Sequence, residues 1–441
     1  MNRSSSFIFC IIYLLALNCY SPSSANPFFT FTDFYDFLDQ YQNATEGDKP
    51  TIINDYMFWQ TNANGGFPAI INATHVVFIY YNSSESITSC LVSLDIFDWV
   101  PFTMVQLDPT VSFFYRAFTL RPSTRANYQF FIDGVKNLDP RNQYRITGIW
   151  GWIDSELALP PFEREYYYVY RPDVPHGSVT PLTNFSSDPY VQIYLPPDYN
   201  VNLVYPVVYF ADGSAYTEVM NTTTILDNLI FDDKIIPLIA VFSDPLGFDP
   251  ERPFEYDWND RSSFYKSRST YLSFLDDLVA YIDDHYSTID SPFARLHVGL
   301  SLTGYVSAYV AFERSDTIKL AAIQSGSSSL TSISYQLENY ANASLDLKFW
   351  ICVGTYESLM SFNEELYKVC KTKEWETEIH FYPEGHSYAF WQHTMDELLV
   401  FFFPNSWTFT TATTTKATIP SWNILLLILS LTIIISKKKS R

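Results

Sequence analysis

Short runs of apolar and β-branched residues, separated by turn residues, dominate the chain between residues 75 and 132. They cover residues 75–81, 87–94, 111–120 and 126–132. Short strands at this spacing are typical of an antiparallel β-sandwich. Asp133-Gly134 predicts a hairpin turn after the last run, the tyrosine-rich segment 165–170 predicts a final strand, and residues 34–41 predict a helix. We therefore expect an all-β sandwich domain over residues 26–172.

A second pattern begins near residue 179, where short apolar runs alternate with helical stretches. The predicted strands lie at residues 191–195, 204–210, 235–242, 297–300, 320–324, 347–353 and 377–382. Helices are predicted at residues 271–286, 305–314 and 362–370. Strands that alternate with helices indicate a largely parallel sheet covered on both faces. The pattern predicts an α/β domain over residues 173–404.

The segment from Arg295 to Gly304, RLHVGLSLTG, has the order of a strand, a sharp turn and a helix. An α/β-hydrolase presents its nucleophilic serine at such a turn, and Ser301 is the candidate here. The G-x-S-x-G pattern asks for glycine two residues after the serine, but this chain has the bulkier and stiffer Thr303. An ordinary strand-to-helix turn would give the same short motif, so the prediction depends on partners elsewhere.

A serine nucleophile needs a base and a group that orients the base. In α/β-hydrolases the acid and then the histidine follow the serine along the chain. Glu357 follows the predicted strand at 347–353, and His386 follows the last predicted strand. The Leu302 amide and the Ser214 amide, the latter in the loop after an earlier strand, are the predicted oxyanion donors.

Motifs over residues 55–403 resemble two known families. The segments are VVFIY at 76–80, YQFFIDGVKNLDP at 128–140, YLPPDY at 194–199, YPVVYFADG at 205–213, RPFEY at 252–256, QSGS at 324–327, VGTYE at 353–357 and GHSYAFW at 385–391. The first two resemble an early-set immunoglobulin-like domain. The others resemble the putative-esterase family, which includes the enterochelin esterases. The resemblance implies an α/β-hydrolase with Ser301 as nucleophile, His386 as base and Glu357 as acid.

The same resemblance implies a set of substrate-side residues. Arg252 and Glu255 would line this side, with Arg252 holding an anionic or carbonyl group; a structural ion pair between the two is the alternative. Tyr216 and Trp391 are further substrate-binding candidates. No metal or organic cofactor is expected for this chemistry.

The net charge and the cysteine content limit the classes of binding partner and metal site that we expect. The 48 acidic residues exceed the 27 basic ones, so the formal charge of -21 would repel a nucleic acid. Cys90, Cys352 and Cys370 remain outside the N-terminal segment, and no Cys/His spacing suggests zinc. For Cys352 and Cys370, a disulfide bridge between them and buried free thiols are the two alternatives.

Both ends of the chain carry targeting features. Residues 1–25 are typical of a secretory signal peptide. A threonine-rich stalk is predicted at 405–418, a transmembrane segment at 419–436 and a basic cytoplasmic tail at 437–441. These features predict a single-pass type I membrane protein of the cell surface or endoplasmic reticulum, with a GPI lipid anchor as the alternative. The N-glycosylation sequons are at Asn43, Asn72, Asn82, Asn184, Asn221 and Asn342.

Three hypotheses on function follow. The first is a membrane-anchored serine esterase that cleaves a small-molecule or glycan ester through an acyl-enzyme. The second is a catalytically inactive glycan-binding or adhesion protein, in which aromatic residues such as Trp99, Trp150 and Trp152 stack on sugars instead of packing in a core. The third is an acyltransferase that uses sugars as acceptors.

Overall fold

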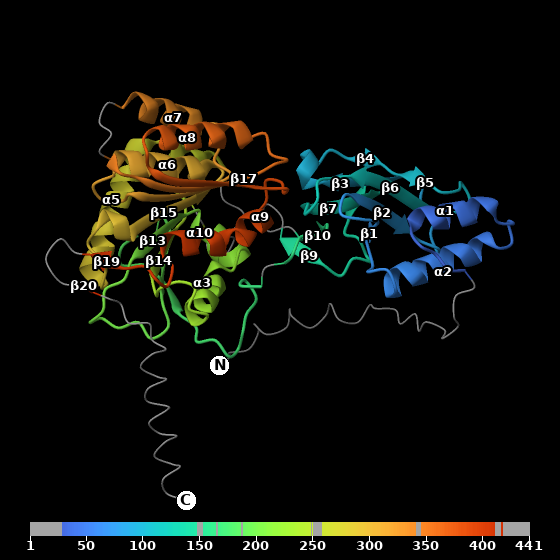
Figure 1. Cartoon of the computed structure of the whole chain (residues 1–441), viewed down its shortest axis with the longest axis horizontal. Helices are drawn as coiled ribbons and strands as arrows, with labels where there is room; N and C mark the ends of the chain where they lie inside the picture. Colours follow the sequence, from blue (N-terminus) through green and yellow to red (C-terminus); the bar gives the residue numbers. More distant parts are fainter. Residues whose placement is uncertain are drawn as a thin grey trace, which may run out of the picture.

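The computed structural model contains a β-rich part and an α/β part that lie side by side (Figure 1). We call residues 29–158 the β-domain and residues 178–402 the α/β-domain. The structure describes residues 29–147, 153–164, 166–186, 188–247, 249, 258–340, 345–410 and 416–417.

Two antiparallel sheets form the β-domain. The first has the order β1 (Ala69–Ile70), β2 (His75–Tyr81), β6 (Phe113–Thr119) and β5 (Val105–Gln106). The second has the order β4 (Phe102–Thr103), β3 (Cys90–Leu94), β7 (Arg125–Ile132), β10 (Ile153–Ala158) and β9 (Arg145–Thr147), and β8 (Val135–Asn137) pairs with β7. Phe78 of the first sheet packs on Tyr128 of the second, with ring centroids 4.7 Å apart. The sandwich is present, and its immunoglobulin-like type stays a prediction.

Helices α1 (Phe34–Asn43) and α2 (Lys49–Asn62) cover the outer face of the first sheet (Figure 1). Their aromatic residues, among them Phe37 and Tyr56, form one buried cluster with Val77 and Ile79 of β2. Strand β2 is therefore buried on both faces, which explains its unbroken apolar sequence. Helix α1 matches the helix predicted at 34–41. Helix α2 was not predicted because its apolar residues are spread around the helix and form no stripe.

Two further predictions for this region have different outcomes. The β7–β8 hairpin turns at Asp133 and Gly134, both with positive φ, as the motif predicts. The prediction of a strand at 165–170 is wrong, because residues 166–169 form turns. Tyr167 and Tyr168 of this segment pack against a core of the α/β-domain instead of pairing in a sheet.

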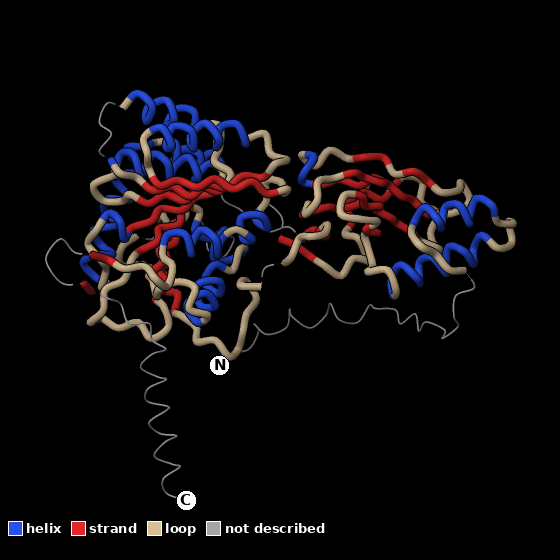
Figure 2. Tube along the Cα trace, in the orientation of Figure 1, coloured by secondary structure: helices blue, strands red, loops and turns tan. Residues whose placement is uncertain are grey.

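An eight-stranded sheet forms the centre of the α/β-domain, with helices on both faces (Figure 2). Its order is β11 (Ser178–Pro181), β12 (Val191–Leu195), β14 (Ile239–Ser243), β13 (Val207–Ala211), β15 (Arg295–Leu300), β16 (Leu320–Gln324), β17 (Lys348–Gly354) and β18 (Glu376–Tyr382). The strands from β14 to β18 in this order run parallel, and β12 is antiparallel to both neighbours. The largely parallel sheet is as predicted.

The helices divide between the two faces, each with its own buried core. One face carries α4 (Trp258–Lys266), α5 (Arg268–His285), α6 (Leu302–Glu313), α7 (Leu330–Asn339) and α8 (Met360–Thr372). The other carries α3 (Thr222–Phe231), α9 (Tyr388–His393) and α10 (Met395–Phe402). Because the parallel strands end at one edge of the sheet, the loops after β13, β15, β16, β17 and β18 meet there.

The predicted localisation needs correction. A bilayer span takes about 20 consecutive apolar residues in a helix. The longest described helix, α5, has 18 residues and carries Asp276, Asp277, Asp283 and Asp284. No helix within the described ranges is long and apolar enough to cross a membrane. The prediction of a single-pass type I membrane protein is corrected on this finding, and neither it nor its lipid-anchored alternative is carried further.

Several targeting predictions concern residues that the structure does not describe. The predicted signal peptide at 1–25, transmembrane segment at 419–436 and basic tail at 437–441 lie outside the described residues. Within the predicted stalk at 405–418, the short strands β19 (Phe409–Thr410) and β20 (Lys416–Ala417) pair in antiparallel fashion.

Candidate active site

Ser301 occupies the sharp turn between β15 and α6. Its backbone has φ 51° and ψ −114°, a conformation that a non-glycine residue adopts only when its surroundings hold it there. The Ser301 amide donates to the Gln324 carbonyl at 2.8 Å, and the Ser327 amide donates to the Ser301 carbonyl at 2.9 Å. These bonds to the last residue of β16 and to the loop after it hold the turn in place, so the predicted elbow is present.

Thr303 fits the elbow without crowding it. A side chain on Gly299 would place its Cβ 2.0 Å from the Thr303 carbonyl oxygen, so close packing of strand and helix depends on Gly299. The Thr303 side chain is fully buried, and its hydroxyl accepts a hydrogen bond from the Leu300 amide at 3.0 Å. The hydroxyl also lies 3.0 Å from Asp212 Oδ2, to which it donates. The departure from the glycine motif is therefore accommodated by a polar contact.

Ser301, His386 and Glu357 form one hydrogen-bonded chain. His386 Nε2 lies 3.0 Å from Ser301 Oγ, and His386 Nδ1 lies 2.6 Å from Glu357 Oε2. The Glu357 side chain is 2% exposed, whereas that of His386 is 33% exposed. A carboxylate beside Nδ1 keeps the proton there, which leaves Nε2 to accept the serine proton. The three residues predicted to act together are thus in contact, from the ends of three different strands.

Two further residues extend this chain behind the acid. Ser325 Oγ donates to Glu357 Oε1 at 2.6 Å, and Trp391 Nε1 donates to Ser325 Oγ at 3.0 Å. The Trp391 ring also stands edge-on to His386, with centroids 4.8 Å apart. The Gly354 amide gives Glu357 Oε1 a second hydrogen bond at 2.8 Å. Sequence reasoning missed Ser325; its only signal was its place in QSGS after β16.

The two predicted oxyanion donors differ in their surroundings. Leu302 is the first residue of α6, so its amide has no intrahelical acceptor. The Ser214 amide donates instead to Asp244 Oδ1 at 2.9 Å, and the Ser214 hydroxyl bonds the same carboxyl at 2.8 Å. The Ser214 amide is therefore engaged elsewhere, which does not fit the predicted role. Among the amides of residues 212–215, that of Gly213 has no hydrogen-bond partner in the described part of the chain.

Of the predicted substrate-side residues, the two described ones are buried. Tyr216 is fully buried, and its hydroxyl lies 3.1 Å from Gln324 Oε1. Trp391 is 2% exposed and bonds Ser325. Both therefore support the site from within the core. Arg252 and Glu255 lie outside the described residues.

The remaining histidines have partners of their own. His297 is fully buried, and its ring nitrogens bond Tyr271 and Ser307. Burial lowers the pKa of His297 to about 3, so this ring stays neutral.

Cys90, Cys352 and Cys370 are free and buried, so the alternative of a Cys352–Cys370 bridge is excluded. No metal-binding group of His, Cys, Asp or Glu occurs among the described residues.

The predicted glycosylation sites differ in exposure. Asn43, Asn72, Asn184 and Asn221 are exposed, and Asn82 is half-buried. Asn342 lies outside the described residues. Glycosylation at these sites stays a prediction.

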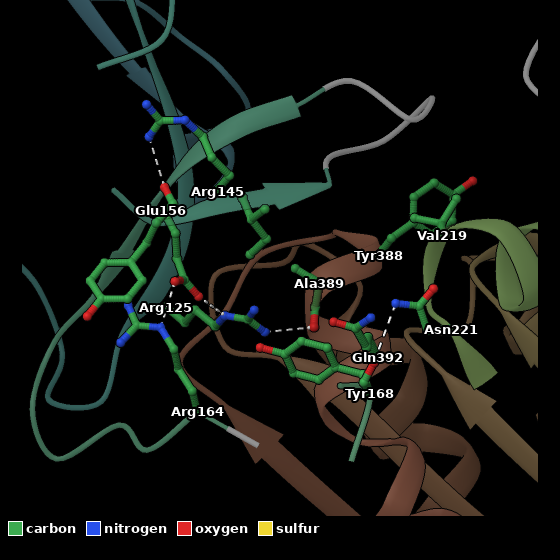
Figure 3. A pocket seen from close by; sticks show the side chains of 12 residues that line it. Arg125, Arg145, Glu156, Arg164, Tyr168, Val219, Asn221, Tyr388, Ala389 and Gln392 are labelled. Carbon is green, nitrogen blue, oxygen red and sulfur yellow. Dashed lines mark hydrogen bonds and ion pairs between the residues drawn. The ribbon is translucent and has the colours of Figure 1, made fainter. Parts of the chain in front are cut away.

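A cavity of about 200 Å³ lies at the junction of the two domains (Figure 3). Arg125 and Glu156 line it from the β-domain, and Tyr388, Ala389 and Gln392 line it from the α9 side. Helix α9 begins two residues after His386. The β-domain therefore contacts the segment that carries the histidine.

Comparison with known proteins supports this reading of the fold. Residues 183–402 match the family of putative esterases. An endo-1,4-beta-xylanase/feruloyl esterase from Xylanibacter ruminicola is 26% identical over 213 residues, which are 45% of this chain and 28% of that protein. The chain thus spans less than a third of that relative.

Two solved structures show a similar fold. The ferric enterobactin esterase from Salmonella typhimurium matches with a TM-score of 0.63 and 16% identity, over 74% of this chain and 93% of that one. The enterobactin esterase from Shigella flexneri, solved in the presence of enterobactin, matches with a TM-score of 0.64 and 16% identity, over 78% and 97%. The chain is a member of the putative esterase family, with a fold similar to that of the enterobactin esterases.

Proposed function

We propose that the chain is a serine esterase in which Ser301 is the nucleophile, His386 the general base and Glu357 the acid that orients the histidine. The observation that carries this proposal is the unbroken chain of hydrogen bonds from Ser301 Oγ through His386 to Glu357. Hydrogen bonds from a nucleophile to a base, and from the base to a group that orients it, are the arrangement that acyl transfer needs.

The chemistry follows from these contacts. His386 Nε2 takes the Ser301 proton as Oγ attacks the ester carbonyl, and the buried Glu357 carboxylate stabilises the imidazolium that forms. The Leu302 amide and the free Gly213 amide are the donors we assign to the oxyanion. The imidazolium then protonates the leaving alcohol, which leaves an acyl group on Ser301. Water activated by His386 attacks this acyl-enzyme and releases the acid.

Labelling with a fluorophosphonate tests the nucleophile. The probe should modify the purified full chain at Ser301, and Ser301→Ala should lose both labelling and ester hydrolysis. Ser327→Ala is the matched control, because the buried Ser327 hydroxyl has no hydrogen-bond partner in the described residues and the change keeps the Ser327 amide. Undiminished labelling of Ser301→Ala would remove Ser301 from the mechanism.

We propose small-molecule or glycan esters as the substrate class. The curated relative is an endo-1,4-beta-xylanase/feruloyl esterase and the solved structures are enterobactin esterases, and at 26% and 16% identity they give no narrower assignment. A panel of aryl, sugar and siderophore esters, with product analysis in the presence of a sugar acceptor, separates hydrolysis from acyl transfer. The hydrogen bonds from Ser301 through His386 to Glu357 give no support to the catalytically inactive alternative.

A further inference from the structure

We propose that Arg125 of the β-domain is a positioning residue for His386, so that the active site is completed by a domain outside the catalytic fold. The inference rests on the proposed function, because it takes His386 as the catalytic base.

Arg125 brackets the histidine with two hydrogen bonds. Its backbone amide donates to the Pro383 carbonyl at 3.2 Å, three residues before His386. Its Nη1 donates to the Ala389 carbonyl at 2.8 Å, three residues after His386, and this contact joins positions 264 residues apart (Figure 3). The segment that carries His386 is therefore held on both sides by one residue of another domain.

The Arg125 side chain is itself fixed. It is 6% exposed, and its Nε pairs with Glu156 Oε1 at 2.7 Å. Glu156 Oε2 pairs in turn with Arg164 Nε at 2.7 Å (Figure 3). Glu384, two residues before His386, lies 3.8 Å from Arg125 Nη1 and accepts a hydrogen bond from His393. A paired, buried guanidinium presents its donors in one fixed plane, which suits it to hold a carbonyl in place.

The same edge of the β-domain also holds the loop that carries the acid. The Arg121 amide donates to the Tyr356 hydroxyl at 2.9 Å, and Thr124 Oγ1 lies 3.1 Å from the same oxygen. Tyr356 directly precedes Glu357. Contacts from residues 121–125 thus reach the neighbours of both His386 and Glu357.

The two loops are also packed directly on one another and on the β-domain. A Cβ on Gly354 would lie 2.3 Å from the Glu384 carbonyl oxygen, and a Cβ on Gly385 would lie 3.2 Å from the Asp95 carboxyl. Since there is no spare room between the loops, a shift of one of them moves the other. A displacement of about 1 Å in a catalytic group reduces the rate about a hundredfold.

The experiment compares Arg125→Met and Arg125→Lys in the full chain with Arg145→Met as the matched control. Within the described residues, the hydrogen bonds of the Arg145 side chain go to the Tyr144 and Asp139 carbonyls of its own domain. For Arg125→Met we expect kcat and the rate of fluorophosphonate labelling at Ser301 to fall together, about ten- to a hundredfold, with KM for a small neutral ester within about twofold. Arg125→Lys keeps a cation beside Glu156 and should recover part of the loss, and Arg145→Met should match the wild type.

The pH dependence gives a readout that a merely structural role would not move. The pH of half-maximal kcat/KM should shift in both Arg125 variants and stay in place in Arg145→Met. Folding is checked by circular dichroism, and if Arg125→Met does not fold, Arg125→Lys decides. A folded Arg125 variant with unchanged kcat, labelling rate and pH profile overturns the inference. A wild-type chain that is not labelled at Ser301 would instead overturn the proposed function.

Discussion

Thr303 donates its hydroxyl hydrogen to Asp212 Oδ2 at 3.0 Å and so ties the nucleophile elbow to the loop after β13. Asp212 is held from its other side by Arg261, whose Nε donates to Oδ1 at 2.8 Å. A residue that departs from the glycine motif thus connects two parts of the proposed site.

Thr303→Val should be more harmful than its small change in shape suggests. The variant leaves the buried Leu300 amide without its acceptor, which costs about 1–3 kcal/mol of the free energy of unfolding. Thr303→Ser keeps the hydroxyl and is the matched control. We expect the stability in urea and the esterase activity of Thr303→Ser to be near those of the wild type, and both to be well below the wild type in Thr303→Val. Equal stability of the two variants would mean that the hydroxyl contacts contribute nothing.

Ser325→Ala tests the support of the acid. The change removes the hydrogen bond to Glu357 Oε1 and leaves Trp391 Nε1 without an acceptor. Because a hydrogen bond to a charged group contributes about 1.5–3 kcal/mol, we expect kcat to fall at least about tenfold with little change in KM. Ser327→Ala, in the same loop, should leave kcat unchanged. Steady-state kinetics of the two variants compare their kcat and KM values. A Ser325→Ala enzyme with wild-type kcat would refute the role of Ser325.

Asp244 should make the stability depend on pH. Burial raises the pKa of Asp244 to about 7, above its ordinary value near 4. The folded state therefore holds a proton that the unfolded state releases, and the resulting stabilisation is present below about pH 4 and is lost as pH rises through 7.

Asp244→Asn should remove this dependence. Since each unit of pKa shift corresponds to about 1.4 kcal/mol, the wild type should lose roughly 2–4 kcal/mol of stability between pH 4 and pH 8 relative to the variant. Asp316→Asn, which alters an exposed carboxylate, is the control. Denaturation at several pH values measures the difference, and parallel curves for wild type and Asp244→Asn would show that Asp244 does not titrate in this range.

The three described cysteines should be unreactive in the native protein. Burial raises the pKa of Cys90 to about 12 and also raises those of Cys352 and Cys370. A thiol reagent followed by peptide mapping should modify none of them before denaturant is added, and each of them afterwards. Ser332→Cys, at an exposed position, should react at once and serve as the control. A disulfide-linked Cys352–Cys370 peptide would contradict the structure.

Much of the site was predictable because chain order constrains it. A hydrolase sheet places the acid after one late strand and the histidine after the next, so Glu357 and His386 could be selected among many acidic residues and seven histidines. The strands of the α/β-domain were likewise marked by short apolar runs. These signals are local in the chain or fixed by topology.

Other features depend on contacts that no local pattern records. Arg125 reaches Ala389 across 264 residues, and nothing in the sequence around either residue indicates the other. The tyrosines near residue 167 have the composition of a strand, but they pack against a neighbouring domain. No local pattern indicates that Asp244 lies beside Ser214 and accepts a hydrogen bond from its amide.

The contacts made by residues 121–125 join segments of the chain that leave the ribosome at different times. Domains tend to fold from the N-terminus as the chain is synthesised. Residues 121–125 leave the ribosome before the loops around Glu357 and His386, so a β-domain folded by then would offer these loops a surface to pack on. The segment matched by the family, residues 183–402, does not include the β-domain residues that contact these loops. A cut between the two domains would separate the catalytic residues from the surface on which their loops settle.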